Sequence, residues 1–229
     1  MKPIISIKNL VKQYSYYKKQ PGLMGSIKSL FHREKLYVEA VKGISFEIQP
    51  GDFVGLVGPN GAGKTTTLKM LSGILYPTSG EVDVLKSKPF EREPEFQKQF
   101  ALVMGQKNQL WWDLPAIESF LLNKAIYEIP DALFKKNLDE LSELLGIKDI
   151  LDVQVRKLSL GQRMKCELVA ALLHSPKVLF LDEPTIGLDV ISQNAIREFL
   201  KTYNQEKGAT IILTSHYMQD IRRLCDRVI

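Results

Sequence analysis

A glycine-rich run at residues 58–66, with the letters GPNGAGKTT, restricts the fold of this chain more than any other feature. The apolar stretch 52–57 before it predicts a buried strand, and residues 64–75 after it have helical spacing. Where side chains are absent, successive backbone N–H groups can form a nest facing the helix N-terminus, and such a nest suits phosphate. The run therefore predicts a phosphate-binding loop between a strand and a helix.

The motif G-x-x-x-x-G-K-[ST] is matched at Gly58, Gly63, Lys64 and Thr65. Lys64 supplies a cation near the β and γ phosphates of a nucleotide, and the Thr65 hydroxyl can ligate Mg²⁺. An ordinary glycine-rich turn is the alternative, but the flanking strand and helix are the context that the motif requires. The residues expected to bind the nucleotide are Gly58, Pro59, Asn60, Gly61, Ala62, Gly63, Lys64, Thr65 and Thr66.

The composition indicates a globular protein, because 229 residues with 45% hydrophobic content can bury a sizeable core. No apolar run approaches the ~18 residues of a membrane-spanning helix. Lys8 and Lys12 interrupt the start of the chain, so we expect no secretory signal and a cytoplasmic protein. Cys166 and Cys225 lack metal or redox spacing. The net charge of +5 suits a polyanionic ligand or an anionic membrane, but it is too small to indicate nucleic acid.

Short β-rich stretches dominate the first third of the chain, and a helical segment follows at about residues 107–157. One helix in it is expected to begin at an Asp131 N-cap and to end at Gly146. Its predicted apolar stripe is Leu133, Phe134, Leu138, Leu141, Leu144 and Leu145. Beyond it, helices alternate with the strands KVLFL and ATIILT, which predicts a parallel sheet covered by helices.

Residues 15–36 form a basic insertion within the strand-rich part. Leu23, Ile27, Leu30 and Phe31 lie at helical spacing among lysines, so a short amphipathic helix is expected. It could contact membrane headgroups or a membrane partner. We favour a solvated surface insertion, because charged faces are usually solvated.

Two predicted strands end in polar residues that suit nucleotide chemistry. In VLFLDEPT, Asp182 at the strand end can hold Mg²⁺, and Glu183 can polarise an attacking water. A surface turn before Pro184 is the alternative, although paired acids at the end of a buried strand are costly without a partner. In ATIILTSH, His216 can hydrogen-bond a γ-phosphate, whereas a lone histidine is more often simply packed or exposed.

Together these residues resemble the nucleotide-binding subunit of an ATP-binding cassette (ABC) transporter, over nearly the whole chain. LSLGQ at 158–162 is similar to the signature motif, Gln106 to the Q-loop glutamine, Asp189 to the D-loop aspartate and His216 to the switch histidine. The resemblance implies one α/β domain, residues 1–229, with a P-loop NTPase fold. That fold has a RecA-like parallel sheet core, an N-terminal antiparallel β subdomain and an inserted α-helical subdomain at about 107–157.

The resemblance also implies a head-to-tail dimer that sandwiches two ATP molecules. A second copy of this chain is the expected partner, because one complete set of motifs makes two identical sites feasible, and a paralogous subunit is the alternative. Ser159, Gly161, Gln162 and Asp189 are then expected at the nucleotide bound by the opposite chain. A serine N-cap with Gln162 at N3 explains the same residues structurally. The implied catalytic residues are Glu183, Gln106 and His216, and the implied Mg²⁺ ligands are Thr65, Gln106 and Asp182.

The chain departs from the family pattern at three places. Leu160 stands where a second glycine is commonest, although Ser159 and Gly161 remain. The adenine-stacking aromatic would be Tyr14 by similarity, but the insertion leaves Tyr16, Tyr17 and Tyr37 as rivals. The last residues, CDRVI, stop inside a strand that the family normally completes, so a truncated C-terminal end is expected.

Within the family, GQKNQLWWDLPAIESF and the basic insertion resemble ATPase subunits of ABC-2 type bacterial exporters. By that resemblance, Trp111 and Trp112 follow the Q-loop where the membrane subunit docks. One of them can contribute to the docking surface, or both can be core anchors.

The leading functional hypothesis is an ATP hydrolase, peripheral on the inner face of the cell membrane, that powers export through a separate integral membrane permease. The chain itself is expected neither to span the membrane nor to bind nucleic acid. A protein that binds ATP without turnover fits poorly with Glu183. A soluble ABC ATPase acting on DNA or ribosomes remains the alternative, although the paired cassettes or long coiled-coil insertion of such proteins are absent. A GTPase would need N-K-x-D, and NKAI lacks the aspartate.

Overall fold

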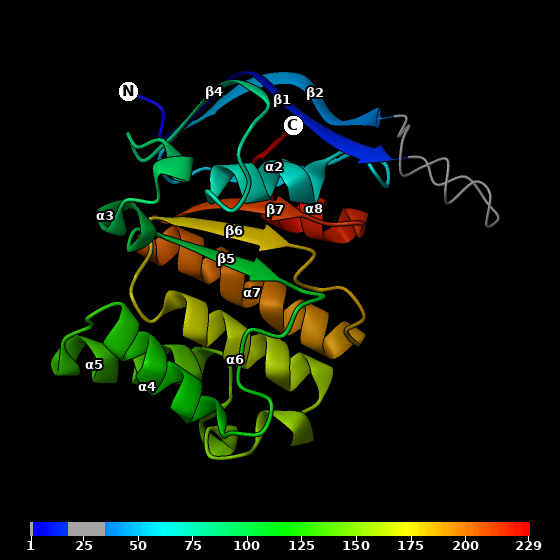
Figure 1. Ribbon diagram of the computed structural model, residues 1–229. Coiled ribbons are helices and arrows are strands. Elements are labelled where there is room, and N and C mark those ends of the chain that lie inside the picture. The colour runs from blue at the N-terminus through cyan, green and yellow to red at the C-terminus, as the bar shows by residue number, and fades with distance from the viewer. Residues whose placement is uncertain (1, 18–34) are drawn as a thin grey trace, which may run out of the picture.

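The computed structural model describes residues 2–17 and 35–229, and its strands form two sheets (Figure 1). The antiparallel sheet has the order β2-β1-β4 and is made of β1 (Ile5–Tyr17), β2 (Lys35–Ile48) and β4 (Ser79–Val84). The parallel sheet has the order β5-β6-β7-β3-β8 and is made of β3 (Phe53–Leu56), β5 (Phe100–Met104), β6 (Val178–Asp182), β7 (Thr210–Thr214) and β8 (Arg227–Val228). The predicted fold class is therefore confirmed.

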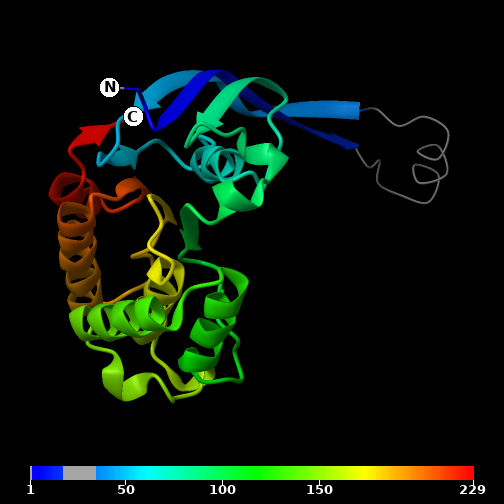
Figure 2. The same ribbon diagram turned by 90° about the vertical axis from the view of Figure 1, so that its left-hand side faces the viewer.

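Helices lie on both faces of the parallel sheet. They are α2 (Lys64–Leu71), α3 (Pro94–Gln97), α4 (Ala116–Ile126), α5 (Asp131–Leu144), α6 (Leu160–Leu172), α7 (Val190–Lys207) and α8 (Met218–Leu224). α2 is sandwiched between the two sheets, whereas α6 and α7 cover the opposite face of the parallel sheet (Figure 1). α4 and α5 pack on α6 and lie within the predicted helical range 107–157 (Figure 2).

Two hydrophobic cores explain why the predicted parallel strands are continuously apolar. In β6, Val178 and Phe180 belong to the core shared with α2 and the antiparallel sheet, and Leu179 and Leu181 to the core shared with α6 and α7. All four side chains are fully buried. A strand buried on both faces needs apolar residues at every position, so it shows no alternation.

The predicted start of α5 is wrong by one residue. Pro130 occupies the N-cap position and makes no side-chain cap, whereas Asp131 is the first helical residue. Proline suits a helix start because its missing N–H would have no acceptor there. Asp131 instead pairs with Lys124 of α4, and this pairing lowers the pKa of the Asp131 carboxyl.

The apolar stripe of α5 is only partly confirmed. Leu141 is buried as predicted, but Leu133 and Leu144 are exposed. A polar residue, Asn137, occupies the buried face because its side-chain amide donates to the Leu173 carbonyl at 2.7 Å. A buried amide with a satisfied hydrogen bond can replace an apolar side chain, and the periodicity of hydrophobic residues does not reveal it.

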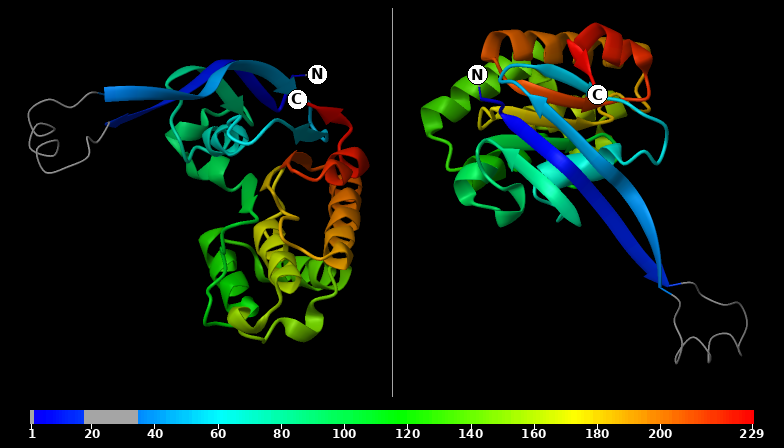
Figure 3. Two further views of the ribbon diagram at one scale, coloured as in Figure 1. Left: turned by 90° about the vertical axis from the view of Figure 1, so that its right-hand side faces the viewer. Right: turned by 90° about the horizontal axis from the view of Figure 1, so that it is seen from above.

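The predicted insertion at 15–36 is narrower than expected, because β1 and β2 continue into it. In the antiparallel register, Tyr17 lies opposite Lys35 and Ser15 lies opposite Tyr37. Figure 3 shows the two strands running together away from the rest of the molecule. The predicted amphipathic helix at 23–31 lies outside the described residues.

None of the helices in the described ranges is both long enough and apolar enough to cross a membrane.

A buried ion pair joins α7 to α8. Arg197 and Asp220 are almost inaccessible to solvent, and Arg197 Nε donates to Asp220 Oδ1 at 2.6 Å. The other carboxylate oxygen accepts from the hydroxyls of Thr185 and Ser215, both at 2.5 Å. Asp220 therefore ties together the loops that follow β6 and β7.

We expect Asp220→Asn to lower the free energy of unfolding by about 3–5 kcal/mol, because it leaves the Arg197 charge buried without its counter-ion. Urea unfolding would measure this. Glu143→Gln is the matched control, since it breaks the solvent-exposed Lys148–Glu143 pair and should change little. Similar small effects for both variants would show that neighbouring polar groups compensate Arg197.

Candidate nucleotide site

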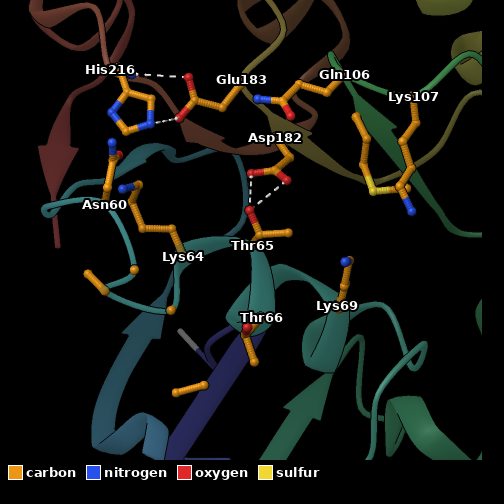
Figure 4. A pocket seen from close by; sticks show the side chains of 15 residues that line it. Asn60, Lys64, Thr65, Thr66, Lys69, Gln106, Lys107, Asp182, Glu183 and His216 are labelled. Carbon is orange, nitrogen blue, oxygen red and sulfur yellow. Dashed lines mark hydrogen bonds and ion pairs between the residues drawn. The ribbon is translucent and has the colours of Figure 1, made fainter. Parts of the chain in front are cut away.

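A cavity of about 380 Å³ lies between the glycine-rich loop and the carboxyl ends of β5 and β6 (Figure 4). Of the predicted site residues, it is lined by 60–66 together with Gln106, Asp182, Glu183 and His216. The structure thus brings the predicted loop and four distant polar side chains into one place. A cavity with several convergent polar groups is the expected form of a ligand site.

The loop backbone takes conformations that only glycine adopts freely. Gly63 has φ +91°, and a Cβ on it would lie 2.1 Å from the carbonyl oxygen of Ala40. Gly61 has φ +81°, and a Cβ on it would meet no atom within 4 Å. Gly63 is thus required by close packing against β2 as well as by backbone conformation. Gly61 leaves space at the cavity wall.

Lys64 is held by its own loop. Its Nζ donates to the carbonyl oxygens of Gly58 at 2.7 Å and Pro59 at 3.1 Å, so these two predicted residues support the lysine without lining the cavity. Lys64 also begins α2, whose first amides have no intrahelical acceptor. A cation and free amides at one helix start fit the phosphates of a nucleotide.

Oxygen donors suitable for Mg²⁺ converge at the end of β6. The Thr65 hydroxyl donates to both oxygens of Asp182, at 3.0 and 2.8 Å, and the Thr214 hydroxyl donates to Oδ1 at 2.7 Å (Figure 4 shows the Thr65 pair). Hydroxyl and carboxylate oxygens are the hard ligands that Mg²⁺ prefers. Within the described ranges no three acidic, histidine or cysteine side chains form a metal cage. The group therefore fits a Mg²⁺ that takes its remaining ligands from phosphate and water.

Glu183 and His216 form a pair at the side of the cavity. His216 Nε2 lies 2.9 Å from Glu183 Oε1, and the His216 amide donates to Oε2 at 3.2 Å (Figure 4). Burial raises the pKa of the Glu183 carboxyl above its ordinary value, and the neighbouring His216 opposes that rise. A carboxylate with a raised pKa is better suited to accept a proton from water near neutral pH.

Glu183 also has a strained backbone, with φ +55° in the left-handed region. Gly105 lies against it, because a Cβ on Gly105 would approach the Glu183 carbonyl oxygen to 2.0 Å. The Gly105 amide donates to the Asp182 carbonyl at 2.8 Å. This close approach positions Gln106, the next residue, on the cavity wall. Strain of this kind is common at functional sites.

The remaining predicted residues lie elsewhere. Ser159 caps α6 in a capping box with Gln162. The Gln162 backbone amide donates to the Ser159 hydroxyl at 3.2 Å, and the Gln162 side chain accepts from the Ser159 backbone amide. Asp189 caps α7 by accepting from the Ser192 amide at 2.9 Å. A Cβ on Gly161 would lie 2.2 Å from the Ser192 hydroxyl, so the starts of α6 and α7 are in contact. Ser159, Gly161, Gln162 and Asp189 form one cluster that does not line the cavity.

Tyr14 also does not line the cavity. It lies on β1 with the Lys12 ammonium 5.3 Å from its ring centroid. Tyr16, Tyr17 and Tyr37 lie further along the same hairpin and are exposed. Tyr14 as the adenine-stacking residue stays a prediction.

Sequence reasoning missed five residues of the site. Ala40, Lys69, Met104 and Lys107 line the cavity, and Thr214 hydrogen-bonds Asp182. Lys69 is four residues after Thr65, one helical turn away, so helix geometry could have identified it. Thr214 lies opposite Asp182 in the β6–β7 register, so a correct pairing of the two predicted strands would have placed it.

Comparison with known proteins agrees with this geometry. A family model described as ABC transporter matches residues 41–186. The ABC transporter ATP-binding protein NatA of Bacillus subtilis is 34% identical over 199 residues, which cover 87% of this chain and 80% of NatA. The bacitracin transport ATP-binding protein BcrA of Bacillus licheniformis is 33% identical over the whole chain, which spans 66% of BcrA's length.

A solved structure extends the comparison to three dimensions. An ATP-binding cassette, described as a dimer in a post-hydrolysis state with bound ADP and phosphate, superposes with a TM-score of 0.78. The two sequences are 25% identical, and the match covers 98% of this chain and 93% of the other.

We expect Gly63→Ala to destabilise the protein more than Gly146→Ala, as measured by urea unfolding. Both glycines have left-handed backbones, but a Cβ on Gly146 meets nothing within 4 Å. The control should therefore cost about 1 kcal/mol of backbone strain. Gly63→Ala should cost about 1–3 kcal/mol more, because the loop must move away from β2. Equal costs would show that the contact with Ala40 relaxes freely.

Proposed function

The chain belongs to the ABC transporter family as an ATP-binding subunit, and from this premise we propose that it hydrolyses ATP to power transport through a separate integral membrane subunit. The observation that carries the proposal is the convergence of Lys64, Asp182, Glu183 and His216 on one cavity. Phosphate binding, metal binding and water activation each have a side chain there.

The proposed chemistry divides among these residues. Lys64 and the first amides of α2 bind the phosphates, and Glu183 accepts the proton of the attacking water. His216 orients the Glu183 carboxylate and can hydrogen-bond the γ-phosphate. Mg²⁺ held by Thr65, Asp182 and Gln106 would neutralise phosphate charge. Gln106, next to this group, would link the nucleotide to the helical part of the chain.

A dimer would complete the site, with a second copy of this chain as the proposed partner. Ser159, Gly161, Gln162 and Asp189 lie outside the cavity, so in head-to-tail pairing they would face the nucleotide of the other copy. Beside them, Val190 and Ile191 are 69% and 82% exposed. Apolar side chains this exposed are typical of an interaction surface. The dimeric relative with bound ADP and phosphate supports this pairing.

The membrane subunit would dock beside Trp111 and Trp112. These side chains are 51% and 48% exposed, so the alternative that both are core anchors is wrong. Exposed aromatic residues often anchor interfaces. The relative BcrA is named for bacitracin transport and other relatives for Nod factor export, which supports export as the direction. This arrangement would hold the subunit at the inner face of the cell membrane, with substrate selection in the membrane subunit.

The nucleic-acid alternative gains no support from these relatives, which are named for transport.

Steady-state ATP hydrolysis at increasing protein concentration tests the proposal, with Glu183→Gln beside the wild type. The rate per subunit should rise with concentration, because each site needs a second copy. It should fall by roughly 10²-fold or more in the variant, which lacks the proton acceptor. Turnover by a chain that size-exclusion chromatography shows to be monomeric at the assay concentration would contradict the dimer, and undiminished turnover in the variant would contradict Glu183 as the base.

We also expect hydrolysis to fall on the acid side at a pH above the ordinary carboxyl pKa, because burial raises the pKa of Glu183 and only its ionised form accepts a proton. His216 opposes that rise, so His216→Gln should move the acid limb of its residual activity to higher pH. The pH dependence of kcat/KM measures both effects. An acid limb that stays in place in the variant would assign it to a different group.

A further inference from the structure

Glu167 is a buried acid that the proposed chemistry does not use. It lies in the middle of α6, with 2% of its side chain exposed. Its Oε1 is 3.8 Å from Arg163 Nε, and the backbone amide of Gln109 lowers the pKa of the carboxyl. Within the described residues its Oε2 has no hydrogen-bond partner. Burying a carboxylate oxygen without a hydrogen-bond partner lowers the stability of the fold. The presence of such a group therefore points to a role.

The contacts of Glu167 join α6 to the segment 109–112. This segment begins three residues after Gln106, and its Gln109 amide lowers the pKa of the Glu167 carboxyl. Arg163 adds a second link, because its guanidinium carbon lies 5.7 Å from the centroid of the Trp112 ring. The Glu167 carboxylate thus faces Arg163, and Arg163 lies against the Trp112 ring of the segment that follows the Q-loop glutamine.

We infer that Glu167 is a positioning residue: its charge clasps the segment 109–112 onto α6, so that Gln106 and the start of α6 move as one body. The inference rests on the proposed function, because Gln106 and the start of α6 need to move together only if both contribute to an ATP site. Loss of the charge would free Arg163 from between Glu167 and Trp112.

The charge of this clasp is sensitive to pH near neutrality. Burial raises the pKa of Glu167 to about 7, against the lowering effects of Arg163 and the Gln109 amide. Cys166, the next residue, stays a neutral thiol because burial raises its pKa to about 12. Among the described residues of the elements that pack against α6, only the Gln109 amide affects the pKa of Glu167. No ionisable group of these elements shifts it further. The clasp should therefore be closed above pH 7 and open below it.

Tryptophan fluorescence can report the clasp without any activity. The chain has two tryptophans, so Trp111→Phe leaves Trp112 as the sole reporter beside Arg163. In this background, Trp112 emission should change between pH 6 and 8 with a midpoint near 7. Adding Glu167→Gln should abolish the transition, because an amide of nearly the same shape cannot ionise. Adding Glu143→Gln, at an exposed site, should leave the transition in place.

A pH-dependent change that persists with Glu167→Gln, or no change in the Trp111→Phe protein, would overturn the clasp.

Hydrolysis distinguishes a positioning role from a merely structural one. Between pH 8 and pH 6 a carboxyl with this pKa goes from about nine-tenths to about one-tenth ionised. The wild-type kcat should therefore fall by up to about ninefold more than that of Glu167→Gln over this interval, with KM for ATP similar in both. The titration of Glu183 is common to both proteins and cancels in the comparison.

Two outcomes separate this inference from the proposed function. A variant that loses thermal stability but keeps the wild-type dependence of kcat on pH would make Glu167 structural only. A wild-type chain without turnover would contradict the proposed hydrolysis, and the fluorescence transition would still decide the clasp.

Discussion

The parallel register of β6 with its neighbours is the constraint on which the site depends. Asp182 is paired with Met104 of β5 and with Thr214 of β7, and Thr214 is paired with Leu56 of β3. Four strands therefore end at one level, and the residues that follow them emerge side by side. A shift of the β6 register by one residue would point the Asp182 side chain into a hydrophobic core and break its hydrogen bonds to Thr65 and Thr214. The continuous burial of β6 and β7 makes such a slip costly, so packing far from the nucleotide stabilises the geometry near it.

The cluster at the starts of α6 and α7 shows how one group can serve both folding and binding. The Ser159 oxygen accepts a hydrogen bond from Gln162 within α6, which leaves its own proton available for a phosphate oxygen. Gly161 allows α6 to approach Ser192 closely, whereas the side chain of Leu160 lies toward Gly187, with its Cδ2 3.3 Å from the position of a Cβ on that glycine. The structural explanation as a helix cap is thus correct and compatible with the nucleotide role proposed for the same residues.

The strands, the glycine-rich loop between a strand and a helix, and the acids at a strand end could be predicted because each is a local pattern with one dominant cause. Predictions failed where a contact from a distant element decides the outcome. Asn137 is buried because its side-chain amide donates a hydrogen bond to the Leu173 carbonyl near the end of α6. The Arg197–Asp220 pair and the partners of Glu167 likewise exist only in three dimensions. In the sequence these residues look like ordinary charges on helices, which are usually solvated.

The length of the β1–β2 ladder has a consequence for how this protein can vary. Its last described pair, Tyr17 with Lys35, holds the two ends of the connection 18–34 side by side. The ladder therefore fixes the distance that the connection has to span, whatever its length. Because β1 and β2 run together away from the rest of the molecule (Figure 3), a change in the length of the connection 18–34 would act far from the glycine-rich loop and leave the nucleotide cavity in place.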